Sequence, residues 1–123
     1  INQISEESGL RIANIFHAGD GNLHPLVLFD ARKQGEIEKA LEAGSACLKA
    51  CADVGGTITG EHGVGIEKRE EMRFVFKDEE IIAQTNIREV FNPDNLLNAG
   101  KLFPSPGRCA EIKREMKEAA MSK

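Results

Sequence analysis

The chain has 123 residues, 41% of them hydrophobic, which is enough for a folded core in one domain or in part of a larger domain. A formal net charge of −4 without any basic cluster argues against a nucleic-acid-binding protein. No apolar run approaches the ~20 residues of a membrane-spanning helix, so no transmembrane segment is expected.

The first third of the chain predicts a β-hairpin. Residues 1–9 show no pattern of an element of their own. Residues 10–18 and 22–30 are rich in branched and aromatic side chains and flank a turn of glycine, aspartate and asparagine. A four-residue loop at 19–22 would pair Ala18 with Leu23 and His17 with His24.

An amphipathic helix is predicted over residues 33–54, because apolar residues recur there at helical spacing. The expected buried stripe consists of Ile37, Leu41, Leu48 and Cys51. Gly55 and Gly56 end this helix, and residues 57–59 are a short strand candidate. Cys47, Cys51 and Cys109 lack CxxC spacing and fit the reduced thiols of a cytosolic protein.

Helices dominate the rest of the prediction. A short one is expected near Lys68, and a longer one from an N-cap at Asp78 to Asn92-Pro93, where the residue before proline avoids helical geometry. Residues 92–107 read as a loop with one helical turn, followed by a last helix. The stripes predicted for the two longer helices are Ala83, Ile87, Val90 and Phe91, and Cys109, Ile112, Met116 and Ala120. The fold class is therefore α+β.

The sequence HAGDGNLHP, residues 17–25, places two histidines around the hairpin turn. Directly paired residues lie on one face of a sheet with Cβ atoms ~5 Å apart, so both imidazoles could reach one metal ion. A slip of one residue would put them on opposite faces. Two ordinary strand histidines are the alternative.

A second glycine-rich stretch, GGTITGEHGVG, holds the third histidine. Its five glycines in eleven residues indicate a sharply turning backbone around Glu61 and His62. Two histidines and one carboxylate form a recognised site for zinc, manganese or iron(II). A tight loop with solvated Glu61 and His62 explains the pattern equally well.

Several other motifs are absent. Neither glycine-rich stretch completes a dinucleotide fingerprint, and no GxxxxGK[ST] phosphate loop or HExxH zinc-protease motif occurs. Catalysis by a cysteine and a histidine stays open, although no cysteine lies in or beside a glycine-rich segment.

Three stretches in order, HAGDGNLHP, GGTITGEHGVGIEKRE and FNPDNLLNAGKLFP, resemble the C-terminal domain of the flavin-linked oxidases of the vanillyl-alcohol oxidase superfamily. The likeness is to members of the glycolate oxidase and D-lactate dehydrogenase type. The resemblance implies a partial ferredoxin-like antiparallel sheet with helices packed on one face, followed by C-terminal helices.

The same resemblance implies that residues 1–123 are a fragment of this cap or substrate domain, with the FAD-binding N-terminal domain absent. Such a fragment is expected to bind FAD weakly, to be inactive alone, and to self-associate through its uncovered sheet.

In the full-length family members, hydride passes from the α-carbon of a 2-hydroxy acid to FAD. Carried over by motif, His17, His24 and Glu61 correspond to ligands of a divalent metal, and His62 corresponds to the base. Asn98 and Lys101 resemble polar residues near the flavin. Asn22 buttresses His17 or the flavin side of the pocket, or is simply a turn residue. Leu26 stands where some relatives carry a polar residue, which favours a small acid such as glycolate or lactate.

The implied partners are a 2-hydroxy-acid substrate and other oxidase subunits or an electron acceptor, with no nucleic acid. The implied location is cytoplasmic, or peripheral to the inner membrane through partner subunits. Two alternatives stand beside the oxidoreductase. One is a non-catalytic metal-binding or interaction module that retains the fold, and the other is an independent metal-dependent hydrolase.

Overall fold

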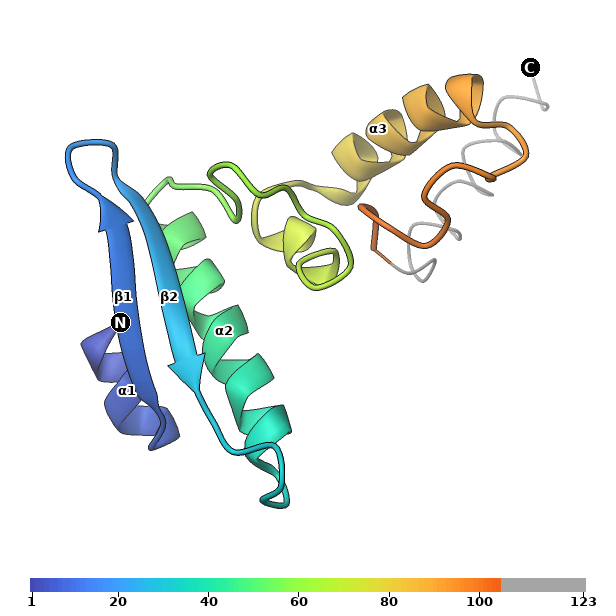
Figure 1. The fold of residues 1–123 in the computed structure, drawn as a ribbon. Helices are drawn as coiled ribbons and strands as arrows, with labels where there is room; N and C mark the ends of the chain where they lie inside the picture. The colour runs from blue at the N-terminus through green and yellow to red at the C-terminus, as the bar shows by residue number, and fades with distance from the viewer. Residues whose placement is uncertain (105–123) are drawn as a thin grey trace. The chain divides into compact units, whose positions relative to one another are not determined.

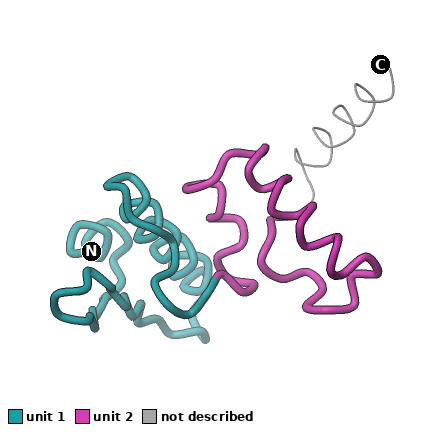
Figure 2. The backbone as a smooth tube through the Cα atoms, turned by 90° about the horizontal axis from the view of Figure 1, so that it is seen from above, with its two compact units in different colours: residues 1–63 teal, residues 64–123 magenta. Residues whose placement is uncertain are grey.

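The computed structural model describes residues 1–104, which belong to two compact units (Figure 2). Unit 1 comprises residues 1–63 and unit 2 begins at Val64. The described elements are three α-helices, one 3₁₀ helix and two strands (Figure 1). This content confirms the α+β class.

Unit 1 is built around an antiparallel hairpin of β1, Arg11–His17, and β2, Asn22–Leu28. The predicted register is wrong by two residues, because His17 pairs with Asn22 and His24 pairs with Ile15. The loop is Ala18–Gly21, where glycines at 19 and 21 adopt positive φ and the Asp20 N–H donates to the His17 carbonyl. A shift by two residues preserves the face of every side chain, so both histidines still share one face.

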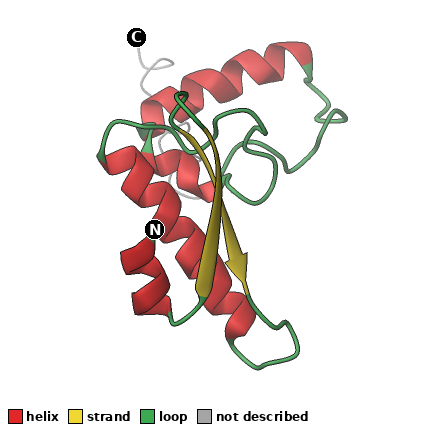
Figure 3. Ribbon diagram, turned by 60° about the vertical axis from the view of Figure 1, so that its left-hand side comes forward, coloured by secondary structure: helices red, strands yellow, loops and turns green. Residues whose placement is uncertain are grey.

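Two helices cover the other face of the hairpin. Helix α1, Asn2–Ser8, packs against β1, and α2, Glu36–Asp53, packs against β2 and α1 (Figure 3). The prediction of no element in residues 1–9 is wrong. A helix of seven residues is too short to form by propensity; here it ends in left-handed Gly9, and the Ser5 hydroxyl donates to the Leu10 carbonyl.

Helix α2 agrees with its predicted span within three residues, but its predicted buried stripe is only partly right, since Leu48 and Cys51 are half-buried. The buried side chains are Ala40, Ala43 and Cys47, whereas Ile37 and Leu41 are exposed. Burial raises the pKa of the Cys47 thiol. The buried side chains of α2 are thus small ones.

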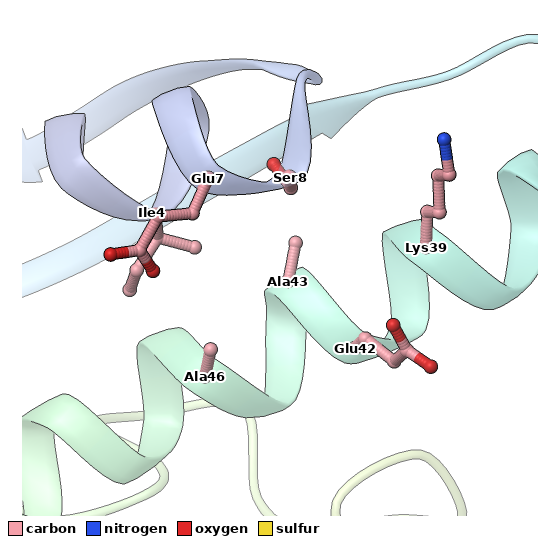
Figure 4. A pocket seen from close by; sticks show the side chains of 7 residues that line it. All are labelled: Ile4, Glu7, Ser8, Lys39, Glu42, Ala43 and Ala46. Carbon is pink, nitrogen blue, oxygen red and sulfur yellow. The ribbon is translucent and has the colours of Figure 1, made fainter.

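An open groove of about 370 Å³ lies between α1 and α2 (Figure 4). It remains because α2 presents only Ala43 and Ala46 opposite Ile4. The other residues lining it are Glu7, Ser8, Lys39 and Glu42.

The segment after α2 leaves the helix through left-handed Gly55 and contains no strand. The strand predicted for residues 57–59 is therefore wrong. Ile58 is buried, so this apolar residue anchors a loop to the core. In the described chain no third strand pairs with the hairpin, and the wider ferredoxin-like sheet stays a prediction.

Unit 2 contains the 3₁₀ helix η1, Glu70–Phe74, and helix α3, Asp78–Phe91. The short helix predicted near Lys68 thus begins two residues later. Helix α3 ends as predicted, but Asp78 is its first residue and not its N-cap, which is Lys77. The Lys77 N–H donates to Glu80 Oε2 at 2.7 Å. Asp78 instead accepts a hydrogen bond from Arg73.

The buried side of α3 also differs from the prediction. Its core residues are Ile81 and Ile82, which join Met72 of η1, whereas Ile87, Val90 and Phe91 are exposed. Residues 92–104 form turns and bends without the predicted helical turn. The last predicted helix, with Cys109, Ile112, Met116 and Ala120, lies outside the described residues. In the described residues, no helix is both long and apolar enough for a membrane span.

Candidate metal and active site

The tip of the hairpin places the first two histidines. His17 ends β1, and His24 lies on β2 diagonally across from it, since their direct partners are Asn22 and Ile15. The faces of a strand alternate residue by residue, so His17, Asn22 and His24 all lie on the face that the helices leave free. The two rings meet edge to face, with centroids 5.3 Å apart.

A tight loop at the end of unit 1 places Glu61 and His62. Thr59 Oγ1 accepts a hydrogen bond of 2.9 Å from the Gly63 N–H, and Gly63 has φ 80°. This contact closes the backbone around the two site residues.

Four predicted site residues meet at one carboxylate oxygen. Glu61 Oε1 lies 3.1 Å from His24 Nε2. The same oxygen lies 3.5 Å from His17 Nε2 and 3.5 Å from His62 Nε2. The rings of His24 and His62 are 5.3 Å apart, centroid to centroid.

The donor atoms of His17, His24 and Glu61 lie within 4.8 Å of one another. Ligands at ~2.1 Å from a tetrahedral zinc ion lie roughly 3.4 Å apart, so small rotations would bring these three into range. Two imidazoles and a carboxylate also suit manganese or iron(II). The donor set therefore fits a divalent cation.

The site is open to solvent on the side of His62. The side chain of His24 is 24% exposed, whereas that of His62 is 72% exposed. A group bound at this cluster would thus contact His24 on its protein side and His62 on its solvent side.

Asn22 packs against the second glycine-rich stretch, a contact that no sequence pattern predicted. A Cβ at position 60 would lie 2.5 Å from Asn22 Oδ1 and 2.8 Å from its Cγ. A side chain at position 60 would therefore require the end of the Asn22 side chain to shift. The recurrence of glycine just before Glu61 was the available signal, but its contact partner could not be read from it.

Asn98 and Lys101 belong to unit 2. They lie in the loop after α3 and contact each other, with Lys101 Nζ 3.4 Å from Asn98 Oδ1. Sequence reasoning missed Arg88, whose guanidinium binds the backbone of this loop. The available signal was a basic residue in the last turn of a helix, where carbonyl groups lack intrahelical partners.

Comparison with known proteins identifies the family of the chain. Residues 1–102 match the family described as FAD linked oxidases, C-terminal domain. The chain belongs to this family. The resemblance inferred from the three sequence stretches is thereby confirmed.

Relatives within the FAD-linked oxidases bear the names of 2-hydroxy-acid oxidoreductases. The chain is 50% identical to glycolate oxidase subunit GlcD of Escherichia coli (strain K12) over 91% of its own length and 22% of that protein. It is 40% identical to GlcD of Bacillus subtilis over 88% of its length and 23% of that protein. It is 36% identical to D-lactate dehydrogenase of Archaeoglobus fulgidus over 82% of its own length and 22% of that protein. The chain thus spans less than a quarter of these relatives.

Proposed function

We propose that the chain is the C-terminal part of a longer FAD-dependent dehydrogenase or oxidase of small 2-hydroxy acids, of the glycolate or D-lactate type. Membership of the FAD-linked oxidase family and the names of the relatives support the reaction class. The observation that carries the assignment of roles is the convergence of three imidazoles on the Glu61 carboxylate.

In this proposal His17, His24 and Glu61 hold a divalent cation, which is zinc, manganese or iron. Their donor atoms have the types and the proximity that such a cation requires. When bound, the cation supplies Lewis acidity toward the carboxylate and hydroxyl oxygens of the substrate. The two histidines orient the substrate because they are fixed on paired strands.

His62 is the proposed general base. Its Nε2 lies beside the ligand cluster yet its side chain is mostly exposed, so it can face the hydroxyl of a bound 2-hydroxy acid. Nε2 accepts the hydroxyl proton while the α-hydrogen leaves as hydride. A positioned base typically contributes ~10²–10⁴ in rate.

FAD supplies the hydride acceptor and is held chiefly by a domain outside this chain. In this proposal Asn98 and Lys101 contact the flavin, because they form an exposed amide and ammonium pair. Asn22 orders the Glu61 loop, since its side chain is packed on Gly60. Leu26 shares the face of His24 and is half exposed, which favours a substrate without a second carboxylate.

Electrons leave the flavin for another oxidase subunit or a separate acceptor. The name of the Escherichia coli relative describes a subunit of glycolate oxidase, which supports an assembly with partner subunits. By this proposal, the chain alone has no turnover and binds FAD weakly, which absorbance during FAD titration would test.

The deciding experiment measures the full-length flavoprotein with glycolate, D-lactate and 2-hydroxyglutarate and a dye as electron acceptor. Glycolate or D-lactate should be oxidised fastest. His62→Ala should lower kcat by about 10²-fold or more, and added metal should not restore it. His17→Ala should lose bound metal, and excess zinc or manganese should restore part of its activity.

Two outcomes would contradict the proposal. Metal binding by the wild type without turnover of any 2-hydroxy acid would support a non-catalytic metal-binding module. Equal rescue of both histidine variants by metal would show that His62 is a ligand and not the base.

A further inference from the structure

Arg88 binds the loop after α3 at several points. Its Nη2 donates to the carbonyls of Leu97 at 2.7 Å and Asn98 at 2.8 Å, and its Nη1 donates to that of Lys101 at 2.8 Å. Nη2 also lies 3.3 Å from Asn95 Oδ1. One guanidinium therefore collects three main-chain carbonyls from five consecutive residues.

The backbone of this loop contains three residues other than glycine with positive φ. Asn95 and Asn98 have φ values of 52° and 50°, a left-handed conformation that asparagine tolerates better than most residues. Leu102 has a φ of 77°, which is uncommon for a leucine and persists only when surrounding contacts hold it. Without a cation among them, converging carbonyl dipoles would repel one another.

Two further side chains brace the same loop. The Asn92 amide donates to the Leu97 carbonyl and its oxygen accepts from the Leu97 N–H. Arg69 donates to the Gly100 carbonyl at 2.9 Å. Each brace reaches one residue of the loop, whereas Arg88 spans it from Asn95 to Lys101.

The side chains of the loop are arranged differently from its carbonyls. Lys101 and Asn98 are exposed, and their polar ends lie 3.4 Å apart. No carboxylate forms an ion pair with Lys101 among residues 1–104. Because Arg88 holds the adjoining carbonyls, it fixes the direction in which this ammonium and amide face.

We propose that Arg88 is the positioning residue that presents Lys101 and Asn98 to the flavin. This inference rests on the proposed function for the identity of the ligand, but the binding of the loop by Arg88 does not. Arg88 itself does not touch the cofactor and acts through Lys101. A planar guanidinium is required because a single ammonium cannot reach carbonyls spread over five residues.

The test compares Arg88→Ala, Arg88→Lys, Lys101→Met and the double variant Arg88→Ala/Lys101→Met in the full-length flavoprotein. Amide hydrogen exchange at residues 97–102 measures the order of the loop, and fluorescence titration measures the dissociation constant of FAD. Arg88→Ala should accelerate exchange at Leu97 and Leu102 about tenfold and weaken FAD about tenfold. Arg88→Lys should give intermediate values.

The double variant decides whether Arg88 acts through Lys101. Its FAD dissociation constant should match, within about twofold, that of the single variant that binds FAD less tightly. The reason is that the free-energy effects of two coupled residues do not add. If the increase in dissociation constant in the double variant equals the product of the increases in the two single variants, the proposal is overturned. Arg69→Ala is the matched control: it removes one carbonyl contact and should change either measurement by about threefold at most.

The two readouts separate failure of this inference from failure of the proposed function. Unchanged exchange in Arg88→Ala would overturn the role of Arg88 whatever happens to FAD. Accelerated exchange with normal FAD binding in both Arg88→Ala and Lys101→Met would overturn the flavin contact of Lys101, and with it the role of Arg88 toward the cofactor.

Discussion

Glu61 contributes the oxygen that the three imidazoles share, and its position depends on residue 60. The Asn22 side chain occupies the space where a Cβ of residue 60 would lie. A side chain at position 60 would therefore displace the end of Asn22 or the Glu61 loop.

Gly60→Ala should weaken metal binding to the chain by about tenfold or more, the range found when outer residues of metal sites are changed. The new methyl group would displace either Asn22 or the loop, and Glu61 would move away from the histidines. Isothermal titration with zinc or manganese measures this effect.

The control for this prediction is Gly44→Ala, where a Cβ meets nothing within 4 Å in the interior of α2. It should leave metal affinity unchanged. Combining Gly60→Ala with Asn22→Ala should recover most of the affinity, because it removes the clashing side chain. Failure of the combined variant to recover would show that residue 60 acts by another route.

At the scale of the elements, the connection from β2 to α2 is held by a hydrogen bond and an ion pair at the Glu36 carboxylate. The Asp30 N–H donates to Glu36 Oε2 at 2.7 Å, and Lys33 Nζ lies 3.1 Å from the other carboxylate oxygen. The backbone N–H and the Lys33 ammonium hold the pKa of Glu36 below its usual range. The Arg32 guanidinium likewise lowers the pKa of Asp30.

A carboxylate whose folded-state pKa is depressed stabilises the fold above its unfolded-state pKa, and the contribution is lost as pH falls through the folded value. The Tm of the wild type should therefore fall between about pH 6 and about pH 3 by more than that of Glu36→Gln. The glutamine still offers an oxygen to Asp30 but does not titrate. Glu38→Gln, on the same turn of α2, should follow the wild type; equal acid sensitivity of all three would contradict the prediction.

Helix α3 permits a matched comparison of its two sides. Ile81 is 2% exposed and Ile87 is 63% exposed, although only Ile87 lies on the stripe predicted from sequence. Ile81→Ala should reduce the free energy of unfolding by about 2–5 kcal/mol. Ile87→Ala should change it by about 0.5 kcal/mol or less. Urea unfolding monitored by circular dichroism measures both, and a larger loss at Ile87 would show that this side is covered in solution.

At the scale of the whole chain, much apolar surface lies outside the core. On the free face of the hairpin, Ile15, Leu26 and Leu28 are each at least 45% exposed. Exposed apolar surface next to unpaired strand edges favours association. We therefore expect the 123-residue chain to self-associate.

Sedimentation velocity should show an average mass that rises with protein concentration. Ile15→Thr/Leu26→Thr should lower this dependence while retaining β-branched or strand-compatible residues on the hairpin. A wild type that stays monomeric over the whole concentration range would refute the expectation.

Local patterns alone predicted several features correctly. Glycines around Asp20 predicted the hairpin, and its even shift in register left both histidines on one face. Helical spacing, with glycine or proline as terminators, predicted α2 and α3 within three residues of their ends. The motifs also predicted the family, because three long stretches of specific residues in order identify a family, whereas the spacing of two single residues is ambiguous.

The tertiary structure decided which side of each helix is buried, where the loops lie, and how the site converges. Ala40 and Ala43 are buried in place of Ile37 and Leu41 because burial depends on which neighbouring element each side of a helix meets. Likewise Asn22 meets Gly60, and Arg88 meets three carbonyls, across separations of 38 and about ten residues that carry no periodic signal. Sequence periodicity records the preferences of one element, whereas packing and convergence depend on pairs of elements brought together only by folding.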